Sequence, residues 1–207
     1  MHRLAGRFFL SAMALVFSCV PLRAQEDDLQ LTARIAGERY CTVSSDVDAL
    51  QITLRLRYTN TGNRKLILYK GNKLFYQIFV SRNLQDAAAR RYETRTTHSR
   101  YYDQQPEKID DAHPGNVFTV LSPGASYEAE QVITLPVARD EGKARRDVLT
   151  TGDHVLQVIV STWYESKKLA EALRERWQRR GFLWTDMLDT QALSFNIGKN
   201  RSAVVCQ

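Results

Sequence analysis

The sequence predicts an all-β fold, an antiparallel β-sandwich, on three observations. Between residues 50 and 58 apolar and polar side chains alternate, which is the period of a strand with one buried face. Turn-forming residues at 60–63, 70–73 and 122–124 separate this stretch from further apolar runs. The hydrophobic fraction of 43% is that of an ordinary folded domain. We therefore expect one sandwich domain over residues 25–207, with a long polar insert and one C-terminal amphipathic helix.

The N-terminus reads as a secretory signal peptide over residues 1–24. A cationic start with Arg3 and Arg7 precedes a short apolar run, and a small residue, Ala24, ends the segment. The protein is thus expected to be exported, to the periplasm or the extracellular space. A lipoprotein signal with Cys19 as the acylated residue is the less favoured alternative, because bulky Phe17 lies beside the processing site.

Removal of residues 1–24, which contain three arginines and no acidic residue, lowers the formal net charge from +6 to +3. Nucleic-acid binding needs a larger and more clustered excess of cations, so none is predicted. Of the three cysteines, Cys41 and Cys206 remain in the mature chain, and export permits them to pair. A structural disulfide between them is expected, since no Cys-x-x-Cys motif indicates a redox or metal site.

The first strand is expected at 29–35, with 40–43 continuing its pairing. The runs 50–58, 66–69 and 74–80 are predicted to be three consecutive antiparallel strands. The turn after the first of them contains Asn60, Gly62 and Asn63, residue types that tolerate positive φ and suit a tight connection.

Residues 82–116 interrupt the strand pattern with a polar insert longer than ordinary connections. Tyrosines and arginines interleave in it, a mixture that suits recognition of a partner. The simpler interpretation is a long hairpin whose aromatic side chains cover one sheet face. The candidate contact residues are Arg90, Arg91, Tyr92, Arg95, Arg100, Tyr101 and Tyr102.

Potential metal ligands also fall in the insert, but without diagnostic spacing. They are His98, Asp103, Glu107, Asp110, Asp111 and His113. Neither a metal nor another cofactor is predicted.

Strands resume at 117–121 and at 127–134, joined by a turn in which Pro123 presets φ and Gly124 supplies the permissive position. Pro136 is expected to end the second of these strands. Residues 139–146 form a charged connection, 155–164 a central buried strand with Trp163 in the core, and 191–197 the last strand.

The segment 57–63 (RYTNTGN), the apolar run that follows it to Tyr69, the strand 74–80 and the segment 121–127 (LSPGASY) together resemble bacterial secreted Ig-like domains. They are more loosely similar to the bacterial intracellular proteinase inhibitor (BsuPI-like) family. The resemblance covers about half of the mature chain and implies an Ig-like sandwich fold. The export signal, the insert and the helix depart from the inhibitor family, and no inhibitory residue can be carried over.

Residues 166–180 change to helical periodicity, with Leu169, Leu173 and Trp177 at four-residue spacing. Ser166 can cap this amphipathic helix and Gly181 can end it. Its cations could contact anionic lipid head groups or an acidic partner. The simpler interpretation is that its apolar side covers an open end of the sandwich. The candidate contact residues on the helix are Lys167, Lys168, Arg176, Arg179 and Arg180.

No catalytic motif is present, so we expect a protein that is not an enzyme. The predicted function is an exported, non-catalytic binding or assembly module of the bacterial cell envelope, with an envelope protein as partner. The helix 166–180 makes an anionic membrane surface a further candidate. The first alternative is an inhibitor or accessory subunit of an extracytoplasmic enzyme such as a protease. The second is a hydrolase with an acidic site that no motif reveals.

Overall fold

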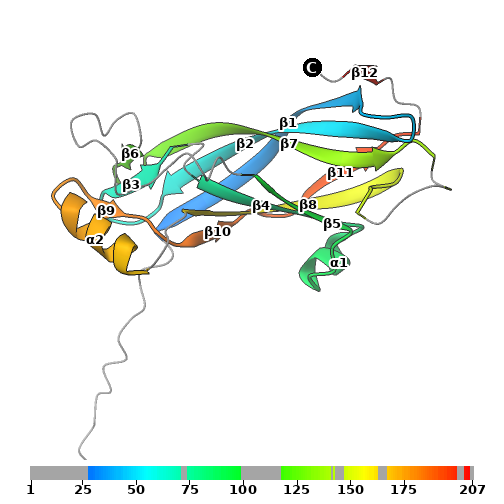
Figure 1. The fold of residues 1–207 in the computed structure, drawn as a ribbon. Helices are drawn as coiled ribbons and strands as arrows, with labels where there is room; N and C mark the ends of the chain where they lie inside the picture. Colours follow the sequence, from blue (N-terminus) through cyan, green and yellow to red (C-terminus); the bar gives the residue numbers. More distant parts are fainter. Residues whose placement is uncertain are drawn as a thin grey trace, which may run out of the picture.

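The computed structural model describes residues 28–70, 74–98, 118–140, 142, 147–162, 167–199 and 203–205. The fold is mostly β, as the sequence predicts (Figure 1). The elements are β1 (Leu29–Thr42), β2 (Val47–Asn60), β3 (Leu66–Tyr69), β4 (Leu74–Ser81), α1 (Leu84–Ala88), β5 (Thr94–His98), β6 (Phe118–Leu121), β7 (Ser126–Ala138), β8 (Gly152–Thr162), α2 (Lys167–Trp177), β9 (Phe182–Leu183), β10 (Met187–Asp189), β11 (Leu193–Ile197) and β12 (Val204–Val205).

Two larger sheets share one hydrophobic core. The first has the strand order β12-β1-β2-β7. The second has the order β10-β8-β4-β5, with β11 also paired to β8. Figure 1 shows the first sheet lying over the second, and apolar side chains from both enter the same buried cluster.

The alternation in β2 sets the inner face of the first sheet. Its apolar side chains are all fully buried, namely Leu50, Ile52, Leu54, Leu56 and Tyr58. The intervening polar side chains lie on the opposite face, since successive residues of a strand point to opposite sides. The predicted buried face of this strand is therefore confirmed.

The three strands predicted between residues 50 and 82 exist, but the expectation that they pair with one another is wrong. β2 belongs to the first sheet and β4 to the second, while β3 lies in a small third sheet of order β6-β3-β9. A local apolar pattern indicates that a segment is a strand with a buried face, but it does not specify the partner strand.

Asn60 directs the chain out of the first sheet. Its side chain is fully buried and donates Nδ2–H bonds to the carbonyls of Arg64 and Leu121, each at 2.8 Å. Its Oδ1 accepts from the backbone N–H of Gly62 at 3.0 Å. None of the residues 60–63 has a positive φ, so the predicted reason for this turn is wrong. Gly62 is required for space, because a Cβ there would lie 2.5 Å from Cγ of Asp28.

Helix α2 and the third sheet close one end of the molecule. Leu173 and Trp177 are buried, and the Trp177 ring lies 4.6 Å from that of Phe118 between centroids. The apolar side of the helix thus covers the end of the core, as the simpler interpretation expects. The helix is shorter than the predicted 166–180. It ends at Trp177, and after a turn the chain reaches Gly181, where φ is +155° and a Cβ would lie 2.9 Å from the carbonyl oxygen of Lys65.

The predicted insert 82–116 is not a plain polar loop where the structure describes it. Its first part forms α1 and then β5, which pairs antiparallel with β4. Residues 99–116 lie outside the described residues. Sequence reasoning also missed β9 and β10, which are too short to show a period.

Pro136 does not end its strand, as expected from the sequence, but lies inside β7 opposite Ala49. β7 is the last strand of its sheet, where proline is tolerated because its missing N–H can face away from the ladder. The predicted turn before β7 is present, and Gly124 has a φ of +77°.

The C-terminal strand β12 runs parallel to β1, with Val204 opposite Cys41. Cys41 is fully buried. Cys206 and the predicted signal peptide lie outside the described residues, as does Trp163. The disulfide therefore stays a prediction. Among the described residues, no helix has the length and apolar character to cross a membrane.

Candidate binding site beside helix α1

An open groove lies where β4 leaves the second sheet and enters α1. Its volume is about 830 Å³, within the range of small-ligand sites. One wall is residues 82–85, at the start of α1. The other wall and the floor come from residues 153–155 of β8 and 194–196 of β11.

Asn83 begins α1 and shapes the first wall. Its backbone is extended, and its Oδ1 accepts the backbone N–H of Asp86 at 2.8 Å, as an N-cap residue does. The cap leaves the following side chain, Leu84, 61% exposed at the groove. Across the groove, Nδ2 of Asn196 donates to Oδ1 of Asp153 at 2.7 Å.

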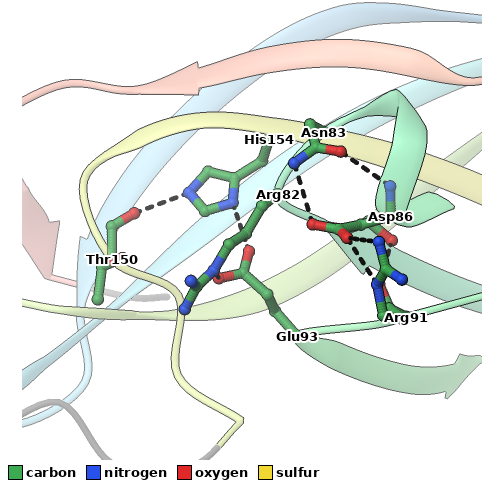
Figure 2. Close-up of polar contacts among 8 residues, drawn as sticks. Arg82, Asn83, Asp86, Arg91, Glu93, Thr150 and His154 are labelled. Atoms are coloured by element: carbon green, nitrogen blue, oxygen red, sulfur yellow. Dashed lines mark hydrogen bonds and ion pairs between the residues drawn. The ribbon is translucent and has the colours of Figure 1, made fainter.

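His154 lies at the groove floor and is 3% exposed. Figure 2 shows its ring held at both nitrogens: Nδ1 is 2.8 Å from Oε2 of Glu93, and Nε2 is 2.8 Å from the carbonyl oxygen of Thr150. A carbonyl oxygen only accepts, so Nε2 must carry a proton. The ring also stacks on Phe195, with 5.5 Å between centroids.

Glu93 links the buried histidine to the surface. Its Oε1 accepts from Nε of Arg82 at 2.9 Å. This hydrogen bond raises the pKa of the Arg82 guanidinium above its ordinary value. The Arg82 side chain is 75% exposed, whereas that of Glu93 is 19% exposed. The guanidinium of Arg82 is therefore exposed to solvent, and the carboxylate of Glu93 lies beneath it.

A second ion pair joins α1 to the residues after it and has the same arrangement. Arg91 contacts Oδ1 of Asp86 at 2.6 Å, and the carboxylate is also bonded by Asn83 (Figure 2). The arginine side chain is 64% exposed and the aspartate 21%. In both pairs the carboxylate is sheltered and the guanidinium faces water.

The described insert residues of the predicted partner surface gather around α1 and β5. Arg90 has a left-handed φ of +55° and is exposed. The Tyr92 ring packs on Phe79 at 4.5 Å between centroids, and Arg95 lies over the same ring at 5.2 Å. We call the exposed cations Arg82, Arg90, Arg91 and Arg95 the arginine surface. Arg100, Tyr101 and Tyr102 lie outside the described residues.

The predicted cations of α2 lie elsewhere. Figure 1 shows α2 at one end of the molecule, well separated from α1. Lys168, Arg176, Arg179 and Arg180 are exposed there, and the side chain of Lys167 is outside the described part. The two predicted basic segments therefore do not form one patch.

Another cation of α2, Arg174, is used inside the fold. Its guanidinium lies 4.6 Å from the centre of the Phe182 ring, and Arg64 lies 3.7 Å from the same ring. Arg174 also donates to the carbonyl of Leu183 at 3.1 Å and to the Thr185 hydroxyl. This arginine stabilises the helix against β9 instead of presenting a charge to a partner.

Sequence reasoning missed the polar network behind the groove. Glu93 and His154 are 61 residues apart, and nothing in their local patterns links them. A usable signal was a histidine in an otherwise apolar strand, because a buried imidazole requires hydrogen-bond partners.

Among the described residues, no group of three or more His, Cys, Asp or Glu side chains is arranged to hold a metal ion. The metal ligands considered from the sequence lie outside the described part, except for the backbone of His98. The chain matches no protein-family model, and no curated protein is detectably similar to it in sequence.

Proposed function

We propose that this chain is an exported, non-catalytic binding or assembly module of the bacterial cell envelope, built on an Ig-like sandwich. Two largely antiparallel sheets that share one core support the Ig-like assignment, since such a domain packs two sheets of this kind face to face. The pattern of residues 1–24 supports export.

The proposal of partner binding rests on the arginine surface. Its cations project to solvent, while Glu93 and Asp86, which pair with two of them, are sheltered. Guanidinium groups bind carboxylates through paired hydrogen bonds and stack on aromatic rings, so they are favoured at protein interfaces. An envelope protein that presents acidic side chains is the partner this surface fits.

An anionic membrane is the less favoured partner. Binding in a bilayer interface needs an amphipathic helix with a free apolar side. In α2, Leu173 and Trp177 already lie in the core, and the described charged side chains Lys168, Arg176 and Glu175 face outward.

The test is cross-linked capture from the envelope fraction of the source cell, with mature protein as bait. Reversing two charges of the arginine surface, Arg90→Glu with Arg95→Glu, should abolish capture of a specific partner. The matched control is Arg34→Glu with Arg57→Glu, which makes the same charge change on exposed arginines of the first sheet. A third bait carries Arg176→Glu, Arg179→Glu and Arg180→Glu on α2.

Equal capture by all baits, or no capture by the unmodified protein, would overturn the proposal. Loss restricted to the α2 bait would move the interface to that helix. If the captured partner is a protease or another extracytoplasmic enzyme, suppression of its activity by the purified protein would select the inhibitor alternative.

A further inference from the structure

We propose that the groove beside α1 binds a peptide segment of the partner that carries a carboxylate next to a large apolar side chain. This inference rests on the proposed function and specifies the ligand chemistry. The groove was not among the sites expected from the sequence, and it lies next to the arginine surface.

Three side chains of the groove favour an apolar group in the ligand. Leu84 is 61% exposed, although an α1 of five residues buries little else than Ala87. Val155 and Phe195 line the groove at 5% and 6% exposure. A leucine-sized side chain seated between them would remove Leu84 from water, which is favourable at about 25 cal/mol per Å² of apolar area buried.

Arg82 favours a carboxylate in the ligand. Its Nε donates to Glu93, and no other hydrogen bond or ion pair of this guanidinium is found among the described residues. The two terminal nitrogens can therefore donate to both oxygens of a ligand carboxylate. On the opposite wall Asp153 is bonded to Asn196, and its negative charge disfavours an acidic group there. The groove thus has a positive and a negative side, and it orients a ligand whose acidic group lies at Arg82.

The buried network holds Arg82 in place before the ligand arrives. His154 is bonded at both ring nitrogens and fixes Glu93, and Glu93 in turn fixes Nε of Arg82 (Figure 2). An arginine that is already ordered loses less side-chain entropy on binding than a free one. His154 and Glu93 are positioning residues in this scheme, and Arg82 is the residue that touches the ligand.

The test uses a phage-displayed library of random hexapeptides selected against the mature protein. We expect the enriched sequences to share Asp or Glu beside Leu, Ile, Val or Phe. Synthetic peptides of that sequence should lose at least tenfold in affinity for Arg82→Gln and for Leu84→Ser. The matched controls are Arg55→Gln, an arginine also bonded to a glutamate, and Val132→Ser, an apolar side chain 48% exposed on β7. Both control variants should keep the affinity of the unmodified protein.

No enrichment, enrichment without an acidic residue, or equal losses in the control variants would overturn the inference. Thermal melts of each variant establish that the fold is intact, since all four positions have exposed or half-exposed side chains. The peptide selection can fail while capture from the envelope succeeds and depends on Arg90 and Arg95. In that case only the groove is excluded as the ligand site. Failure of that capture as well removes the proposed function.

Discussion

Replacing His154 should destabilise the whole second sheet and not only the groove. The side chain is 3% exposed and makes two hydrogen bonds of 2.8 Å, to Glu93 and to the Thr150 carbonyl. His154→Ala removes both bonds and leaves a cavity beside Phe195. It also leaves the sheltered carboxyl group of Glu93 without its buried hydrogen-bond partner. Breaking a buried pair of this kind costs about 3–5 kcal/mol in the free energy of unfolding.

Glu93→Gln is the informative comparison. Its amide can donate to Nδ1 of a neutral His154, and its carbonyl can still accept from Arg82, so every hydrogen bond can persist. The expected loss is about 1 kcal/mol, because a hydrogen bond to a charged group is replaced by a weaker neutral one. Arg82→Ala should leave stability essentially unchanged, because that side chain is 75% exposed.

Urea denaturation of the three single variants, followed by far-ultraviolet circular dichroism, measures these differences. A double-mutant cycle with His154→Ala and Glu93→Ala should give a coupling energy of about 0.5–3 kcal/mol. The reasoning is refuted if His154→Ala costs less than about 1 kcal/mol, below the loss expected from breaking this pair. It is also refuted if Glu93→Gln costs as much as His154→Ala.

Three further predictions concern the core and the tail. Burial raises the pKa of Tyr76 to about 12, so unfolding should become easier by about 1.4 kcal/mol per pH unit as pH rises from 10 towards 12, where the unfolded chain ionises first. Tyr76→Phe should weaken that dependence in urea titrations. Trp177→Ala should cost about 3–5 kcal/mol by calorimetry, because the ring is buried against Phe118. The proposed disulfide predicts no alkylation of Cys41 or Cys206 in the urea-unfolded chain before reduction, and a loss of about 2–5 kcal/mol in Cys206→Ser.

Each of these has its own control. Tyr92→Phe, a half-buried ring on α1–β5, should keep the full alkaline dependence, and equal slopes in both variants would contradict the role of Tyr76. Arg179→Ala, exposed just after α2, should leave the melting temperature unchanged. Free thiols in the unreduced mature protein would exclude the disulfide.

The all-β class and most strand positions could be predicted from the sequence because burial of one face imposes a period of two. The run 50–58 shows this, since all its apolar positions are fully buried. Gly124 was predictable for a related local reason: a turn with positive φ favours glycine, and the residue has a φ of +77°. Composition also singled out Arg90, Arg91 and Arg95, and the structure leaves all three exposed near α1 and β5, while their role as a partner surface stays a prediction.

Only the tertiary structure decided which strands pair and which charged groups meet. β2, β3 and β4 follow one another in the chain yet lie in three sheets. Pro136 is accommodated because β7 is the last strand of its sheet. Glu93 and His154 meet across 61 residues. Period and turn chemistry are properties of neighbouring residues, whereas pairing and buried polar networks are selected by how the whole core packs.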